Sequence, residues 1–328
     1  GNLLLSAATN FGASQTISIS SGGIGVGYTP ASLPTFTDTT GSTGGVYGIN
    51  YSGDGAVTSL ASLYNGNWFL GSFTTGTYTG SSLASGNTSK YRLGGGGGTL
   101  TIQNSVLTGA NDAVIGGTGG GNVILAGSNT FTGKTTLQNG TLTVSSLNNV
   151  SGGSASSSLG APTTVPNGTI DIGSTTNAVT LAYTGTGETT DRVLNFTGTT
   201  GAVSFTNSGT GNLNFSSAVT FTGTGARTIT LGTSADTYGG SLNTITNAAG
   251  STKVSVTKNG LSNSTWTLAG TSAYTGDTII NGGVISASDL LPNSYIKLNG
   301  SSGQQAVFQS QGTLTRTFSE FVTIEQQD

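Results

Sequence analysis

Short segments in which polar and apolar residues alternate recur along this chain. Clear examples with a period of two are residues 16–20 (TISIS), 99–103 (TLTIQ), 228–231 (TITL) and 253–257 (KVSVT). This alternation is typical of β-strands with one buried face. Between residues 169 and 231 such segments begin every 7–14 residues, and Gly, Asn, Ser and Thr separate them. Because no segment places apolar residues at helical spacing, the pattern predicts an all-β fold with almost no helix.

Part of this pattern is an internal repeat. Residues 125–142 read LAGSNTFTGKTTLQNGTL and residues 268–285 read LAGTSAYTGDTIINGGVI, which agree at seven of eighteen positions. A degraded third copy, LGTSADTYGGSL, covers residues 231–242. Repeated short strands joined by Gly and Asn turns are typical of solenoids. A sandwich of unrelated strands would also fit the strand spacing but has no reason to repeat a sequence. We therefore expect a right-handed parallel β-helix, that is, a β-solenoid.

The repeat also predicts which side chains face the inside, because equivalent coils need equivalent inward residues. These positions are Leu125, Leu137, Leu142 and Val144 in the first copy, and Leu268, Ile280, Ile285 and Ala287 in the second. We expect them to form a thin core of stacked apolar side chains.

The composition favours the same architecture. Charged residues make up 6% of the chain, against roughly 25% in an ordinary soluble domain. A solenoid stacks equivalent positions about 4.8 Å apart, so like charges would repel one another along the stack. Thr, Ser and Asn stack without that repulsion and can form hydrogen bonds along the ladder.

The chain changes character near residue 92. Residues 1–92 hold many of the large aromatic side chains, whereas five consecutive glycines at 94–98 open the more repetitive part. We therefore expect a less regular N-terminal β region over residues 1–92, acting as a cap or carrying inserted loops. Residues 93–328 are predicted to form the repetitive β-solenoid.

Two longer segments carry a family resemblance. Residues 121–144 (GNVILAGSNTFTGKTTLQNGTLTV) and 264–287 (STWTLAGTSAYTGDTIINGGVISA) resemble the autotransporter-associated β-strand repeat, also called the passenger-associated transport repeat. The resemblance implies a right-handed parallel β-helix in a secreted or surface-displayed bacterial protein, and it implies no particular activity. The chain contains no Met, so we expect it to be a processed part of a longer precursor.

The residue types limit the available chemistry. The chain has no His and no Cys, which removes the usual general base, the commonest metal ligand, the thiolate nucleophile and cysteine zinc sites. Its aspartates are isolated and form no calcium-binding loop. Residues 133–135 (GKT) resemble the end of a phosphate-binding loop, but the upstream Gly is misplaced, so we predict a turn. We expect no cofactor, no metal and no enzymatic activity.

Glu188, Asp191 and Arg192 form the densest charged cluster in the sequence. Two carboxylates could serve as the catalytic pair of a glycosidase, and some parallel β-helices are polysaccharide-cleaving enzymes. Our favoured interpretation is a solvated loop that holds a local ion pair of small energetic value.

Four N-terminal aromatic residues, Tyr64, Trp68, Phe69 and Tyr78, are the candidate contact surface for a glycan or another partner. Consecutive strand residues point to opposite faces, so either Trp68 or Phe69 should point outward. The alternative is that these rings pack into the end of the solenoid, as large aromatic side chains usually do.

Together these observations predict an extracellular or cell-surface structural protein that serves as a stalk, fibre or matrix element. Its expected partner is itself, in head-to-tail or lateral assembly. The alternative is an adhesin that binds a glycan or another cell through the N-terminal aromatic residues, and a polysaccharide-cleaving enzyme is the least favoured. The net charge of −3 argues against nucleic acid as a partner. No apolar run approaches the length of a membrane-spanning segment.

Overall fold

The structure is a computed structural model of the 328-residue chain. It describes residues 2–6, 15–19, 22–38, 44–54, 56–150, 156–174, 176–248, 252–289, 291, 293–300, 304–310 and 322–324. The chain divides into two compact units. Unit 1 comprises residues 1–144 and 153–168, and unit 2 comprises residues 145–152 and 169–328.

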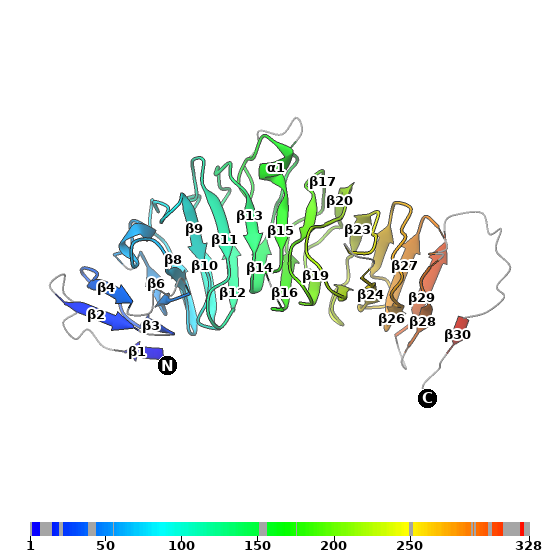
Figure 1. The fold of residues 1–328 in the computed structure, drawn as a ribbon, viewed down its shortest axis with the longest axis horizontal. Coiled ribbons are helices and arrows are strands. Elements are labelled where there is room, and N and C mark those ends of the chain that lie inside the picture. Colours follow the sequence, from blue (N-terminus) through cyan, green and yellow to red (C-terminus); the bar gives the residue numbers. More distant parts are fainter. Residues whose placement is uncertain are drawn as a thin grey trace. The chain divides into compact units, whose positions relative to one another are not determined.

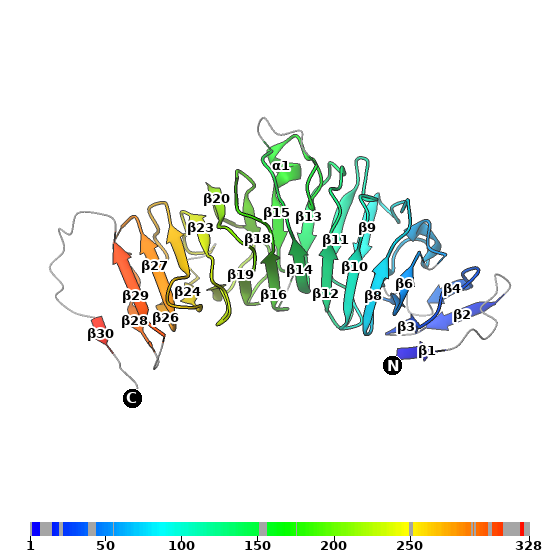
Figure 2. The same ribbon diagram turned by 180° about the vertical axis from the view of Figure 1, so that it is seen from behind.

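In unit 1 the chain alternates between two parallel sheets. One sheet contains β1 (Asn2–Leu5), β3 (Gly23–Val26), β5 (Val46–Ile49), β7 (Phe69–Gly71), β9 (Lys90–Leu93), β11 (Asp112–Ile115) and β13 (Thr135–Leu137). The other contains β6 (Ser52–Gly53), β8 (Thr75–Tyr78), β10 (Thr99–Ile102), β12 (Asn122–Leu125) and β14 (Gly140–Val144). A separate pair joins β2 (Thr16–Ile19) and β4 (Thr35–Asp38). Figures 1 and 2 show β8, β10, β12 and β14 following one another as successive rungs.

Unit 2 contains three parallel sheets. The β15 sheet holds β15 (Ile170–Ile172), β18 (Leu194–Phe196) and β21 (Thr220–Phe221). The β16 sheet holds β16 (Val179–Tyr183), β19 (Val203–Asn207), β22 (Arg227–Leu231), β24 (Val254–Lys258), β26 (Thr278–Ile280), β28 (Ile296–Leu298) and β30 (Val322–Ile324). The β17 sheet holds β17 (Glu188–Thr190), β20 (Leu213–Ala218), β23 (Gly240–Asn243), β25 (Thr265–Leu268), β27 (Gly283–Ala287) and β29 (Ala306–Ser310).

The predicted fold class is confirmed: the chain is all-β, and its parallel strands stack as a β-solenoid of about 12 turns in all. Helix in the described residues is limited to the short elements η1 (Leu60–Ser62) and α1 (Val165–Gly168). The boundary expected at residue 92 falls within β9, which pairs with β11 on its C-terminal side. The division into a less regular region before residue 93 and a repetitive solenoid after it stays a prediction.

The two repeat copies occupy equivalent places in their coils. Each contributes a strand, a loop, a second strand, a tight turn and a third strand, which are β12, β13 and β14 in the first copy and β25, β26 and β27 in the second. The first and third strands are neighbours in one sheet, so that Leu125 lies beside Val144 and Leu268 beside Ala287. All eight expected inward residues are buried, with at most 1% of any of them exposed.

The loops of the repeat are fastened to the preceding coil in the same way. The Asn129 Oδ1 atom accepts the Leu107 N–H at 3.1 Å, and the Ser272 Oγ atom accepts the Ile245 N–H at 3.2 Å. Both residues hold the fifth position of the repeat and are buried. Each therefore satisfies a backbone donor that the coil corner would otherwise leave without a partner.

The tight turn before the third strand requires glycine. Gly140 has a φ of 78° and Gly283 a φ of 79°, in the region that residues with a Cβ atom rarely adopt. A Cβ atom on Gly140 would lie 2.3 Å from the Gly121 carbonyl oxygen, and one on Gly283 would lie 2.6 Å from the Ser264 carbonyl oxygen. The coils therefore stack too closely at this turn for any larger residue.

The inward register predicts a large difference between two acidic substitutions in the same repeat. Leu142→Asp buries an unpaired carboxylate in the core and should lower the free energy of unfolding by more than about 4 kcal/mol. Lys134→Asp introduces the residue that the second copy carries at this position, Asp277, and should cost less than about 1 kcal/mol. Urea unfolding measures both, and equal losses would contradict the register.

The close stacking at the turn predicts a second difference, between two glycines of similar φ. Gly97 has a φ of 83°, but a Cβ atom there would find its nearest neighbour, the Gly119 carbonyl oxygen, at 3.7 Å. Gly97→Ala should therefore cost only about 1 kcal/mol for its backbone conformation. Gly140→Ala adds the clash and should cost at least about 2 kcal/mol more. If thermal unfolding showed equal costs, close coil contact would not be the reason for the glycine.

Candidate functional site

Most of the expected N-terminal contact surface lies inside the protein. Trp68 and Tyr78 are fully buried and Phe69 is 4% exposed. Tyr64 is half-buried, and its ring lies 5.9 Å from that of Trp68. The interpretation of this cluster as an exposed platform is therefore wrong for Trp68, Phe69 and Tyr78.

The physical reason is that unit 1 covers both faces of β7. Trp68 precedes the strand and packs 5.2 Å from the Phe36 ring. Phe69 lies on the other face, as strand alternation requires, but it packs there in a second apolar cluster with Val46 and Val114, against which Phe73 also packs. A Cβ atom on Gly117 would lie 3.1 Å from the Phe69 ring, so a glycine-rich segment from a later coil also covers this face.

Tyr78 occupies a core position whose polar end is satisfied. Its hydroxyl oxygen lies 2.7 Å from the carbonyl oxygens of both Val57 and Ser82. Burial raises the pKa of Tyr78 to about 12. Such a phenol is a structural member of the core and offers no surface to a ligand.

The Glu188, Asp191 and Arg192 cluster holds a backbone segment of unit 2. The two Glu188 carboxylate oxygens accept the N–H groups of Leu147 (2.8 Å) and Asn148 (2.9 Å). Asp191 Oδ1 accepts the Val150 N–H at 2.6 Å. These bonds occupy both carboxylates with backbone donors that β-pairing does not satisfy.

Arg192 completes this arrangement from inside. It is 1% exposed, and its Nε atom donates to the Leu147 carbonyl oxygen at 2.9 Å. Burial lowers the pKa of Arg192 to about 10, against the opposing influence of Glu188 and Asp191. The expectation of a solvated loop is therefore wrong for Arg192, which is buried, whereas Glu188 and Asp191 are half-buried. The three side chains together clamp residues 147–150.

The GKT sequence at residues 133–135 forms a bend at Gly133 and then enters β13 at Thr135. The Gly133 N–H donates to the Asn111 carbonyl oxygen at 3.1 Å, and the Lys134 N–H donates to Asp112 Oδ1 at 2.8 Å. The backbone donors that a phosphate-binding loop would offer to a ligand are thus used within the protein at these two residues.

Two further inward cations escaped the sequence analysis. Arg227 is 4% exposed, and its Nη2 atom lies 2.6 Å from the Gly198 carbonyl oxygen and 3.1 Å from those of Thr199 and Thr224. Lys258 is fully buried, in register between Leu231 and Ile280. The sequence did indicate that Lys258 is buried, because the alternation that points Val254 and Val256 inward also points Lys258 inward.

Lys258 is held by the corner of the coil. Its Nζ atom donates to the Asn259 carbonyl oxygen, to Ser264 Oγ at 3.3 Å and to the Gly282 carbonyl oxygen at 3.5 Å. Burial lowers the pKa of Lys258 to about 8, although nearby Asp236 favours the charged form. The buried cation thus satisfies corner carbonyl groups at the cost of its own hydration.

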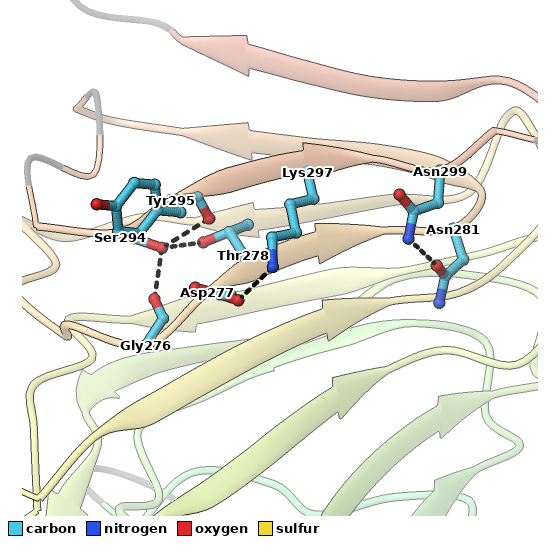
Figure 3. Close-up of polar contacts among 8 residues, drawn as sticks. All are labelled: Gly276, Asp277, Thr278, Asn281, Ser294, Tyr295, Lys297 and Asn299. Atoms are coloured by element: carbon cyan, nitrogen blue, oxygen red, sulfur yellow. Dashed lines mark hydrogen bonds and ion pairs between the residues drawn. The ribbon is translucent and has the colours of Figure 1, made fainter. Parts of the chain in front are cut away.

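Polar side chains also link neighbouring coils on the outside of unit 2. Figure 3 shows three such links between the β26 and β28 segments. They are Ser294 Oγ to the Gly276 carbonyl oxygen (2.7 Å), Lys297 Nζ to Asp277 Oδ2 (2.7 Å) and Asn299 Nδ2 to Asn281 Oδ1 (3.3 Å). Asn281 continues the ladder through a 2.9 Å bond from its Nδ2 atom to Asn259 Oδ1. The outer ladder therefore joins three successive coils.

Two open hollows in unit 2 lie beside a loop at residues 232–239. One, of about 720 Å³, is lined by residues 232–234 of the loop and by outward side chains of the β16 sheet such as Thr180 and Thr230. The other, of about 530 Å³, is lined by residues 237–239 together with Asn212, Asn263 and Thr265. Both linings consist of uncharged residues.

Among the residues that the structure describes, no three His, Cys, Asp or Glu side chains come together where they could hold a metal ion. No helix in the described ranges is long and apolar enough to cross a membrane.

Comparison with known families agrees with the resemblance noted in the sequence. A family model described as passenger-associated-transport-repeat matches residues 118–144 and 256–287. These segments contain β12 to β14 and β25 to β27, so the matched repeats are the two equivalent coils described above. The comparisons with curated proteins and with solved structures found no match.

Lys258 predicts how stability changes with pH. Its pKa is about 8 in the fold and about 10.4 in an unfolded chain. The unfolded state therefore binds more protons at Lys258 between these values, and the contribution of Lys258 to the free energy of unfolding should rise by about 2 kcal/mol from pH 8 to pH 10. Tyrosines such as Tyr78, whose pKa is raised in the fold, oppose this rise as the pH approaches 10 and outweigh it above that pH, because they ionise first in the unfolded chain.

Urea unfolding at constant ionic strength tests this dependence. The free energy of unfolding of the unchanged protein, taken relative to that of Lys258→Met, should rise by about 2 kcal/mol between pH 8 and pH 10. Lys297→Met, which removes a half-exposed lysine from an ion pair, should follow the pH dependence of the unchanged protein. If the Lys258→Met variant showed the same pH dependence as the unchanged protein, the lysine would not have the lowered pKa.

Proposed function

We propose that this protein is a structural passenger domain, displayed outside the cell, in which the β-solenoid acts as a stalk or fibre. The observation that carries the proposal is that charged side chains form hydrogen bonds to the protein's own backbone. Glu188, Asp191, Arg192, Arg227 and Lys258 all bind backbone groups at coil corners. Residue types that elsewhere perform chemistry here hold successive coils together.

The architecture supports a mechanical role. Each coil contacts its neighbours through backbone ladders, a stacked core and outer side-chain links, so stability in a solenoid accumulates along the stack. The passenger-associated-transport-repeat match supports a place outside the cell. A polysaccharide-cleaving function gains no support, because both carboxylates of its candidate pair accept backbone N–H groups.

End-to-end assembly is part of the proposal. Within the described residues, β1 pairs on one side only, with β3, and its Leu3 and Leu4 side chains are 50% and 57% exposed. An unpaired strand edge with apolar side chains is a template for pairing with another chain. This edge would contact a different surface of a second copy, which is a heterologous contact. Such contacts can add copies without limit and form a filament instead of a closed ring.

Electron microscopy and sedimentation velocity of the purified chain at high concentration test this assembly. We expect fibres with an axial repeat of ~4.8 Å. The double substitution Leu3→Asp and Leu4→Asp should leave monomers, because it places two charges on the pairing edge. Val165→Asp changes an apolar residue of α1 that is 59% exposed, and it should assemble like the unchanged protein. A wild-type chain that stays monomeric at high concentration would contradict the assembly proposal.

A further inference from the structure

The loop at residues 232–239 coincides with the degraded third copy of the repeat. In the two clear copies the aromatic residue is buried: Phe131 is fully buried and Tyr274 is 1% exposed. In the third copy the aromatic residue follows its Thr instead of preceding it, and this residue, Tyr238, is 40% exposed. The repeat therefore departs from its pattern at a place where an aromatic ring leaves the core.

A buried carboxylate holds the base of this loop. Asp236 is 3% exposed, and its Oδ2 atom accepts the N–H groups of Asn207 at 2.8 Å and Thr233 at 3.1 Å. Its Oδ1 atom accepts the Thr233 hydroxyl at 2.8 Å. The loop is thus fixed to the preceding coil from within.

The backbone that follows the Tyr238 side chain is fixed as well. The Ser264 hydroxyl donates to the Tyr238 carbonyl oxygen at 3.2 Å, and the same oxygen of Ser264 accepts a bond from Lys258 Nζ. Asn207 Nδ2 donates to the Gly239 carbonyl oxygen at 2.7 Å, and the Gly239 N–H donates to Asn212 Oδ1 at 3.3 Å. An exposed ring on a fixed backbone is preorganised to receive a flat apolar surface.

The hollow of about 530 Å³ beside Tyr238 supplies hydrogen-bonding groups and no charge. Its lining is Asn212, Thr237, Tyr238, Gly239, Asn263 and Thr265. Asn212 uses only its carbonyl oxygen within the described residues, so its amide N–H groups remain available. Asn263 is exposed, and its side chain makes no hydrogen bond to any residue that the structure describes. Amide and hydroxyl groups that share a hollow with an aromatic ring match a ligand with hydroxyl groups around an apolar ring face.

We propose that this hollow binds a neutral oligosaccharide, with the Tyr238 ring stacked on one sugar face. Asn212, Asn263, Thr237 and Thr265 bind its hydroxyl groups. A neutral chain is favoured over an acidic one because no Lys or Arg lines the hollow to pair with a carboxylate. The second hollow, of about 720 Å³, is lined by residues 232–234 of the same loop but by no aromatic residue, so it lacks the stacking element.

This inference does not depend on assembly into fibres. A solenoid that remains monomeric could still bind a saccharide, and a fibre could form without binding one. Sedimentation measures assembly, and the binding assay measures saccharide binding. The two proposals can therefore fail independently of each other.

The test begins with the full chain on immobilised neutral glucans, mannans, galactans and xylans, with polygalacturonate as the acidic comparison. We expect binding to at least one neutral polymer, and titration calorimetry with its oligosaccharide then gives the affinity. Tyr238→Ala should bind at least roughly tenfold more weakly, and Asn263→Ala should also bind more weakly. Tyr295→Ala removes another exposed ring of unit 2, 48% exposed, and should leave the affinity unchanged.

A second measurement uses the unchanged protein and does not depend on how the variants fold. Nitration by tetranitromethane should modify both exposed tyrosines, and the bound oligosaccharide should slow the modification of Tyr238 but not that of Tyr295. The proposal is overturned if no neutral polymer binds, if only the acidic polymer binds, or if the saccharide leaves Tyr238 as reactive as before.

Discussion

Parallel pairing of each coil with the next is the constraint on which the rest of this structure depends. It places residues of equivalent register above one another, so that Leu231, Lys258 and Ile280 form one stack. An inward charge then has apolar residues above and below it, and the nearest groups that can satisfy it are the carbonyl oxygens of the coil corner. Lys258 uses such oxygens, and Arg227 and Arg192 do the same at other corners. The low charge content, the outer Asn ladder and the required turn glycines follow from the same stacking.

The sequence carried enough information to predict the strands and the inward register of the repeats. Alternation in a β-strand has a period of two, and the repetition of a whole coil identified Leu125, Leu142 and their counterparts as core residues. The same alternation points Lys258 inward, but local sequence gives no sign that a buried ammonium is satisfied there. Its partners include Gly282, 24 residues away, and no local pattern reveals that the carbonyl of a neighbouring coil will lie within reach.

The candidate sites show the same limit. Strand alternation correctly placed Trp68 and Phe69 on opposite sides of the chain. Phe69 is nevertheless buried as well, because Val114 and Gly117 of a later coil help to cover the outer face. The clearest local signal of a site was a defect in the pattern. The third repeat copy, with Tyr238 on the other side of its Thr, marks the loop whose aromatic ring is exposed.

A disulfide cross-link tests the parallel stacking most directly, because the chain contains no Cys of its own. Ile124 and Thr143 are outward neighbours in register on β12 and β14, within the distance that a disulfide can span. A chain with Cys at both positions should oxidise readily to the cross-linked form. Cys at 124 and 141 lies diagonally across the strands, roughly 8 Å apart, and should remain reduced under the same conditions. If the 124 and 141 pair cross-linked as readily as the 124 and 143 pair, the register of β12 with β14 would be wrong. Equivalent residues of successive coils would then not lie above one another.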